Sequence, residues 1–177
     1  MSSAFERIAS ETKFAGRIIT VREDRFRYAD GEEADREIVA HPGAVGVVAH
    51  DEEFVYLVRQ PRETVGAPDL LELPAGKLDA EGESPEDTGR RELAEEIGKA
   101  ADTWEHLHSF YSSVGISDEE VHVFLATGLT DVQKPETDED ERIELVAWPL
   151  AELDAAIEEC VDAKTLIGLL ELRRRRR

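Results

Sequence analysis

Apolar and β-branched residues, interrupted by turn-forming residues, predict β-strands in the first third of the chain. A β-branched run at 16–21 predicts one strand, and two more, at 25–28 and 34–40, flank the turn-forming pair Asp30-Gly31. Residues 1–14 show no clear period, so we expect a frayed segment or a short strand there. The pattern therefore predicts a small antiparallel sheet in the N-terminal third.

The middle of the chain contains apolar runs that predict a larger, buried sheet. Residues 44–50 are almost all apolar, which is typical of a strand that is buried on both faces. Further strands are expected at 54–59, 70–73, 104–111, 120–129 and 143–148. After them, helical spacing of leucines predicts one helix that begins at Pro149 and another that is capped by Asp162. This combination of elements predicts an α/β fold.

A third helix is predicted by its two ends. Ser84 suits the N-cap, Pro85 suits the first helical position, and Gly98 suits the left-handed residue that ends a helix. Between these ends, Leu93 and Ile97 share a face that is suited to the core. We therefore expect a short capped helix over 85–97.

The same helix carries Glu92, Glu95 and Glu96 within about one turn. Carboxylates this close repel one another unless a cation lies among them, and hard oxygen ligands suit Mg²⁺ or Mn²⁺. The alternative is an ordinary solvated helix face in an acidic protein. Spacing alone leaves both interpretations open.

The charge balance limits the class of partner. The chain has 177 residues, a length that suits one domain, and its 41 acidic and 21 basic residues give a net charge of −20. Such a surface repels nucleic acid and anionic membranes, so a phosphate substrate must be attracted by local arginines and cations. Only 5 basic residues are lysines, and this composition suggests adaptation to a high-salt, halophilic cytosol.

The remaining composition indicates a cytoplasmic protein. The single cysteine, Cys160, rules out a disulfide framework within the chain and a cysteine-rich zinc module. We also expect no signal peptide and no membrane span, since no apolar run approaches the roughly 20 residues that a span needs. The five arginines at 173–177 are interpreted as complementing a helix dipole rather than as a nucleic-acid patch.

The acidic helix belongs to a longer motif. Residues 76–98 read G-x6-E-x7-R-E-L-x-E-E-x-G, which resembles the Nudix box, G-x5-E-x7-R-E-U-x-E-E-x-G-U with U a bulky aliphatic residue. There are two departures, one extra residue between Gly76 and Glu83 and Lys99 in place of the final aliphatic residue. Neither changes the glutamates that would face a metal, so we expect the chemistry to be retained.

Nearly the whole chain from about Gly16 to Leu172 resembles the ADP-ribose pyrophosphatase branch of the Nudix hydrolases. The resemblance rests on 16–18, 36–37, 41–44, 58–62, 72–76, 115–119 and 138–141. It implies a Nudix-type α/β/α sandwich with a mixed central sheet plus a small N-terminal antiparallel sheet. It also implies a homodimer with N-terminal exchange, in which one subunit helps to build the site of the other. We expect a dimerising N-terminal region over 1–42 and a Nudix domain over 43–177.

The resemblance implies roles for particular residues. The metal ligands would be the carbonyl of Ala75 and the carboxylates of Glu92, Glu96 and Glu141, with Glu139 as general base. The substrate-binding residues would be Arg62, with Arg59 less surely, at the diphosphate, Glu119 at the terminal ribose, Arg17 and Ile18 at adenine, Arg36 and Glu37 from the partner subunit, and Gly115.

Elementary chemistry supports these roles apart from the resemblance. A diphosphate carries adjacent negative charges, so its cleavage needs cations that bridge the phosphoryl oxygens. A glutamate on a loop can complete the proton transfer from an attacking water, and the planar fork of Arg62 suits phosphate better than a lysine does. The ordinary alternatives are that Arg62 is a surface residue and that the acidic run at 136–141 is only solvated.

Several functions remain open at this point. Val114 stands where the ADP-ribose branch usually has a proline before Gly115, so another nucleoside diphosphate sugar such as GDP-mannose is the alternative substrate. A catalytically silent Nudix domain that senses a nucleotide is the alternative from another class. The complete set of glutamates favours the enzyme. An NADH-directed relative would usually carry a zinc ribbon, which one cysteine cannot build.

Overall fold

The computed structural model describes residues 4–134 and 142–176 of the chain. The contacts divide the chain into two units. Unit 1 consists of Met1–Gly43 and Tyr111–Glu120, and unit 2 of Ala44–Phe110 and Val121–Arg177. Glu139 and Glu141, for which the sequence predicts catalysis and metal binding, lie outside the described residues.

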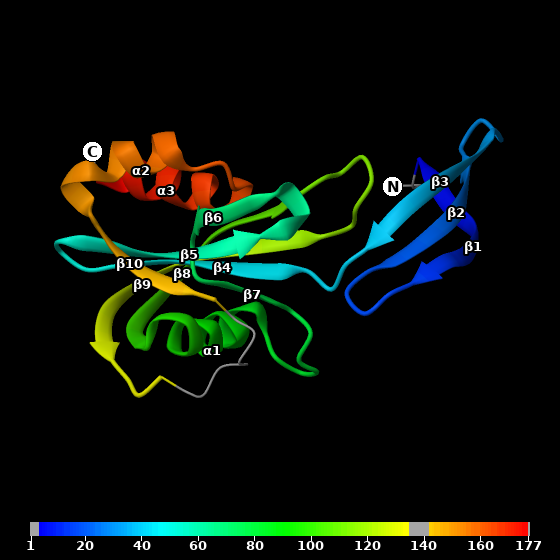
Figure 1. Ribbon diagram of the computed structural model, residues 1–177. Helices are drawn as coiled ribbons and strands as arrows, with labels where there is room; N and C mark the ends of the chain where they lie inside the picture. The colour runs from blue at the N-terminus through cyan, green and yellow to red at the C-terminus, as the bar shows by residue number, and fades with distance from the viewer. Residues whose placement is uncertain (1–3, 135–141, 177) are drawn as a thin grey trace. The chain divides into compact units, whose positions relative to one another are not determined.

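Unit 1 contains an antiparallel sheet in the order β1-β2-β3 (Figure 1). Its strands are β1 (Phe5–Ala15), β2 (Thr20–Tyr28) and β3 (Glu33–Ala40). Gly31 has φ of 88°, a left-handed conformation that glycine adopts without steric cost, in the turn between β2 and β3. The small N-terminal antiparallel sheet and its hairpin are therefore confirmed.

The predicted strand at 16–21 is wrong at 16–19, and its last two residues, Thr20 and Val21, begin β2. Residues 16–19 form the bend between β1 and β2, and the long strand β1 precedes them. All but one of the β1 residues are exposed, because β1 pairs with β2 on one side only and buries neither face in the chain. A strand without a buried face shows no alternation of apolar and polar residues, so its sequence carries no period.

Hydrogen bonds to β3 fix the loop 111–120 within unit 1. Val39 N donates to Ile116 O at 2.7 Å, and Ser117 Oγ donates to Val39 O at 3.0 Å. Asp118 accepts from His41 N at 2.9 Å and pairs with Arg22 at 2.8 Å. These contacts attach the turn-rich segment that carries Gly115 and Glu119 to the N-terminal sheet.

Unit 2 is built on a mixed sheet, seven-stranded among the described residues, in the order β10-β5-β4-β9-β8 with β6 beside β5 and β7 beside β4. The strands are β4 (Ala44–His50), β5 (Phe54–Arg62), β6 (Ala67–Glu72), β7 (Ala75–Lys77), β8 (Lys99–Tyr111), β9 (Glu120–Asp131) and β10 (Glu144–Pro149). Strand β4 is parallel to β9 and antiparallel to β5 and β7.

Helices cover both faces of this sheet. Helix α1 (Pro85–Ile97) lies on one face, and α2 (Leu153–Glu159) and α3 (Ala163–Arg175) lie on the other (Figure 1). Two short 3₁₀ turns, Glu63–Val65 and Leu150–Glu152, connect elements, the second forming the start of the helix predicted at Pro149. The predicted α/β/α sandwich with a mixed central sheet is confirmed.

The central strand shows why its sequence is almost wholly apolar. Val47 packs in a cluster with Leu93 of α1, whereas Val48 packs in a second cluster with Leu169 of α3. All four side chains are fully buried, and a strand that contributes to two cores has no polar face.

The C-terminal arginines form ion pairs within unit 2. Arg173 pairs with Asp154 at 3.0 Å, and Arg175 pairs with Glu105 at 2.8 Å. They belong to the last turn of α3, where positive charge complements the helix dipole. No helix in the described ranges is long and apolar enough to span a bilayer.

Candidate functional site

Capping interactions define both ends of α1. Ser84 Oγ accepts from Asp87 N at 3.2 Å, and Asp87 Oδ2 accepts from Ser84 N at 3.3 Å, which forms a reciprocal capping box. At the other end Gly98 is left-handed, with φ of 65°. The predicted ends of the acidic helix are thus confirmed, and the helix has a defined start and stop.

Glu92 and Glu96 of α1 lie against the short strand β7. A Cβ atom added to Gly76 would lie 1.9 Å from Glu92 Oε1, so only glycine leaves room for this carboxylate. Glu96 is 5% exposed, and its Oε2 accepts from Ala75 N at 2.9 Å. The structure therefore brings together three of the four predicted metal ligands, Ala75, Glu92 and Glu96.

Arg91 is the cation beside this cluster, and the sequence reasoning gave it no role. Its Nη1 donates to Glu92 at 2.8 Å and to Glu95 at 2.9 Å, and its Nε lies 3.4 Å from Glu83. Burial alone would lower the pKa of Arg91, but the charge of Glu92 and the hydrogen bond to Glu95 raise it above its usual value. The guanidinium thus offsets part of the repulsion among the glutamates.

The donor atoms here suit a hard divalent cation. A carbonyl and two carboxylates on adjacent elements offer the oxygen ligands that Mg²⁺ and Mn²⁺ prefer. Within residues 4–134 and 142–176, no three side chains of His, Cys, Asp or Glu form a metal-binding group. The predicted fourth ligand, Glu141, lies outside those ranges.

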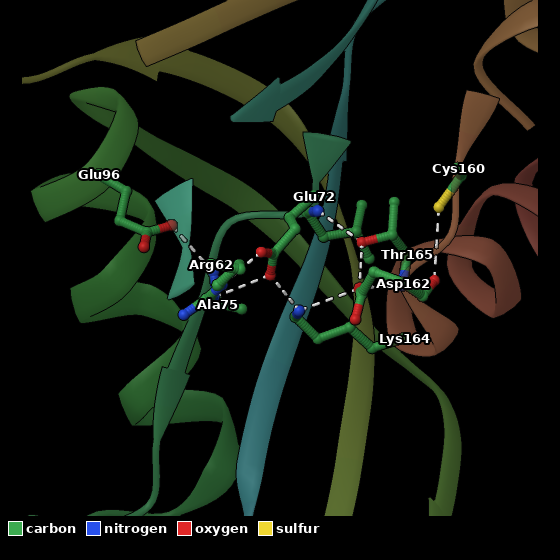
Figure 2. Close-up of polar contacts among 9 residues, drawn as sticks. Arg62, Glu72, Ala75, Glu96, Cys160, Asp162, Lys164 and Thr165 are labelled. Atoms are coloured by element: carbon green, nitrogen blue, oxygen red, sulfur yellow. Dashed lines mark hydrogen bonds and ion pairs between the residues drawn. The ribbon is translucent and has the colours of Figure 1, made fainter. Parts of the chain in front are cut away.

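Arg62 lies in a buried network (Figure 2). Its Nε and Nη2 donate to the two oxygens of Glu72 at 2.5 and 2.8 Å, and Lys164 Nζ donates to the same carboxylate. Lys164 also pairs with Asp162 at 2.9 Å. Although burial alone would raise it, hydrogen bonds from Arg62 and the charge of Lys164 hold the pKa of Glu72 below its usual value. The guanidinium of Arg62 is thus fixed by two hydrogen bonds to a buried carboxylate and is not an unpaired surface group.

Arg59, the less certain phosphate contact, differs from Arg62. It pairs with Glu159 and lies 3.5 Å from Asp69, and both of these carboxylates are exposed. It belongs to β5, two residues before the proline that precedes Arg62. The buried carboxylate network therefore includes Arg62 and not Arg59.

Unit 1 brings Arg36, Glu37 and Gly115 to the wall of one cavity of about 570 Å³. Arg36 Nη2 donates to Tyr28 Oη at 3.0 Å. The cavity also has aromatic walls, formed by Phe5, Phe26, Tyr28 and Tyr111. Rings and a guanidinium suit a flat, polar ligand. Sequence reasoning missed the rings, although Phe26 and Tyr28 point to the same face of a strand.

The other predicted substrate residues of unit 1 do not line this cavity. Arg17 and Ile18 are exposed in the bend between β1 and β2. Glu119 follows the cavity loop, and its Oε1 lies 3.4 Å from His41 Nδ1. The structure thus separates the predicted adenine contact, Arg17 and Ile18, from the cavity in the same unit.

Comparison with known proteins gives two family matches. The NUDIX domain matches residues 40–167, and the nucleoside diphosphate sugar hydrolase N-terminal domain matches residues 5–39. Together these matches cover most of the chain and divide it at residues 39 and 40.

Individual relatives point the same way. An ADP-ribose pyrophosphatase of Mycobacterium tuberculosis is 42% identical over 94% of this chain and 82% of its own length. The Bacillus subtilis ADP-ribose pyrophosphatase is 41% identical over 92% and 89%. A GDP-mannose pyrophosphatase of Cronobacter sakazakii is 33% identical over 96% and 93%. A crystal structure of an ADP compounds hydrolase, 23% identical, superimposes with a TM-score of 0.83 over 97% of this chain and 94% of that chain, which supports the fold.

Proposed function

The chain belongs to the Nudix hydrolase family, and from this premise we propose that it hydrolyses the diphosphate bond of ADP-ribose to AMP and ribose 5-phosphate. The observation that carries this proposal is the similarity to two ADP-ribose pyrophosphatases along almost the entire chain. That similarity includes the N-terminal segment as well as the NUDIX domain. A shared N-terminal segment favours a shared substrate because part of the wall of the unit 1 cavity, including Arg36 and Glu37, belongs to it.

The proposed roles follow the predicted residues. Arg62 binds the diphosphate, Glu139 accepts the proton of the attacking water, Glu119 binds the terminal ribose, and Gly115 is a further substrate contact. Arg36 and Glu37 bind the nucleotide in the site of a partner subunit, and Arg17 with Ile18 contacts its adenine. What supports Arg62 is its fixed guanidinium, which matches phosphate geometry.

Divalent metals are general in Nudix hydrolases, and we propose Mg²⁺ or Mn²⁺ for this chain. The carbonyl of Ala75 and the carboxylates of Glu92, Glu96 and Glu141 would hold the ion. A bound ion supplies positive charge to the diphosphate and favours ionisation of water near neutral pH. The packing of Glu92 and Glu96 against Ala75 and Gly76 supports this assignment.

A second candidate is hydrolysis of another nucleoside diphosphate sugar. The 33% identity to a GDP-mannose pyrophosphatase over nearly the full chain favours it, as does Val114 before Gly115. Both candidates use the same glutamates and differ only in the residues that contact the nucleoside and the sugar.

A substrate panel tests the proposal. We would compare kcat/KM for ADP-ribose, GDP-mannose, NADH, diadenosine polyphosphates and dNTPs, with Mg²⁺, with Mn²⁺ and with a chelator. ADP-ribose should be preferred, and the chelator should abolish turnover. A preference of about tenfold for GDP-mannose, about 1.4 kcal/mol in the transition state, would replace the substrate and leave the pyrophosphatase reaction intact. Binding without turnover of any of these compounds would favour a sensor.

We also propose that the chain works as a cytoplasmic homodimer in which region 1–42 exchanges between subunits. Exposed apolar side chains of the N-terminal region support this, namely Phe5, Phe14 and Ile18, which are 53%, 56% and 55% exposed. Sedimentation velocity of the full chain and of a Phe14→Ser variant tests the dimer, which the substitution should weaken.

A further inference from the structure

Lys164 stands in a position where a lysine is unfavourable for the helix itself. It is the second residue of α3, after the cap Asp162 and Ala163. The first turn of a helix carries partial positive charge and favours acidic residues. The acidic residues preferred there are absent from the first turn of α3. Another interaction must therefore account for this lysine.

That interaction is the buried carboxylate of Glu72. Glu72 is 1% exposed, and both of its oxygens accept from Arg62, while Oε2 also accepts from Lys164 Nζ. Figure 2 shows Arg62 and Lys164 reaching the carboxylate from β5 and α3. Because Lys164 also pairs with Asp162 at 2.9 Å, two cations and two carboxylates balance in charge here, and Glu72 is shared between both cations. The charge of Glu72 is then shared, and less of it offsets the guanidinium of Arg62.

The geometry leaves one edge of Arg62 available. Nε and Nη2 are directed at Glu72, whereas Nη1 donates to no group in the described part of the chain. The Arg62 side chain is 41% exposed. A bidentate contact on one edge fixes the plane of the guanidinium, so the direction of the Nη1 edge is fixed as well.

The backbone on both sides of Lys164 is also fixed. Thr165 Oγ1 accepts from Leu73 N at 2.8 Å and donates to Asp162 Oδ2 at 2.6 Å. Because Leu73 follows Glu72 directly, the start of α3 holds the end of β6 at two adjacent residues. The distance from Lys164 to the carboxylate is therefore set by the fold.

We propose that Lys164 is a positioning residue for substrate binding, which holds Glu72 so that Arg62 presents its Nη1 edge, with its positive charge, to a nucleoside diphosphate. The inference rests on the proposed role of Arg62 at the diphosphate. Lys164 acts through Arg62 and does not contact the substrate.

Replacing Lys164 with Met tests this. We expect KM for ADP-ribose to rise about ten- to a hundredfold, as for loss of a charge-assisted hydrogen bond, with kcat changed much less. Lys164→Arg should restore KM. The matched control is Lys99→Met, because Lys99 is also largely buried and paired with one aspartate, at 2.8 Å, but is no part of this network. It should lower Tm and leave KM unchanged.

A double-mutant cycle shows whether Lys164 acts through Arg62 or contacts the substrate directly. In an Arg62→Ala background, Lys164→Met should raise KM little further, because Arg62 is already gone. An undiminished rise of KM in that background would mean direct contact between Lys164 and substrate and would overturn the proposal. So would an unchanged KM in Lys164→Met itself. Should that variant not fold, Lys164→Gln keeps a donor without the charge, and the same comparison applies.

Calorimetric binding of ADP separates this inference from the proposed function. If the wild type does not cleave ADP-ribose, the function fails, yet weaker ADP binding by Lys164→Met with rescue by Lys164→Arg still supports the positioning role. If the wild type cleaves ADP-ribose and Lys164→Met binds ADP as tightly as the wild type does, the positioning role fails and the function stands.

Discussion

Gly76 shows how tightly the carboxylates of α1 pack against β7. Because a methyl group there would overlap Glu92, we expect Gly76→Ala to displace that carboxylate. If Glu92 is a ligand, affinity for Mn²⁺ should fall about tenfold or more, and kcat/KM should fall with it. Calorimetric titration with Mn²⁺ measures the first effect, and circular dichroism should show that α1 remains helical.

Gly46 supplies the control for this substitution. It pairs with Ala75 across the sheet, but a Cβ atom there would lie 3.6 Å from Leu73, an ordinary contact. Gly46→Ala should therefore leave Mn²⁺ affinity nearly unchanged. Equal losses in the two variants would show that any added methyl disturbs the sheet, and normal Mn²⁺ binding by Gly76→Ala would remove Glu92 from the ligand set.

The two acidic loops give a second prediction at the level of single residues. Glu139→Gln should lower kcat by roughly a hundredfold or more with little change in KM, because a general base acts in the transition state. Glu119→Gln should instead raise KM, since its proposed contact is with the terminal ribose. Steady-state kinetics on both variants tests this, and the opposite pattern would exchange the two assignments.

Among the elements, those with local signals were predictable from sequence. The ends of helix α1 are marked in the sequence by its capping residues, Ser84 and Gly98, and β4 is an almost wholly apolar run. For β1 the sequence leaves a frayed segment or a short strand open and does not predict its 11 residues, because the strand buries no face. Arg17 and Ile18 were placed in a strand because β-branched residues favour strands, but they form a bend.

The residues of the site that were not predicted from sequence have a common cause. Arg91 and Lys164 were not predicted because their partners are chosen by tertiary packing, which for Lys164 joins residues 92 positions apart. The unfavourable place of Lys164 in the first turn of α3 was the available sequence signal. By contrast, Glu92 and Glu96 could be grouped from spacing alone, since both belong to one helix face.

The start of α3 provides a prediction about pH. Burial alone would raise the pKa of Asp162, but the charge of Lys164 and hydrogen bonds from Thr165 outweigh it and hold the pKa below its usual value of 3.8. Asp162 therefore stabilises the folded chain above that pH, and this contribution is lost as the pH falls through the lower folded-state pKa.

Asp162→Asn keeps a good capping side chain but removes the charge. At neutral pH it should cost roughly 1 kcal/mol, and its Tm should fall less steeply than the wild-type Tm as the pH drops below about 4. Melts across a pH series measure both effects. Asp154→Asn, an exposed aspartate on α2, serves as control and should retain the wild-type slope. Parallel curves for wild type and Asp162→Asn would contradict the assignment.

At the scale of the whole molecule, two electrostatic effects of opposite sign compete. A net charge of −20 causes self-repulsion, which salt screens and so relieves. Exposed ion pairs such as Arg25–Asp35 are weakened by the same screening, but each contributes little. We therefore expect relief of repulsion to dominate, so that salt raises stability.

The halophilic interpretation is tested by the sign of that response. Between about 0.1 M and 1 M KCl the Debye length falls from about 10 Å to about 3 Å, so Tm and kcat should both rise.

A variant with Glu32, Glu63 and Glu81 replaced by Gln removes three exposed charges that form no ion pair in the described chain. It should melt higher than the wild type at low salt and gain less from KCl, because it has less repulsion to screen. Sorbitol, which raises no ionic strength, should not reproduce this difference between the two proteins. A Tm that stays flat or falls with KCl would show that the acidic surplus is not an adaptation to salt.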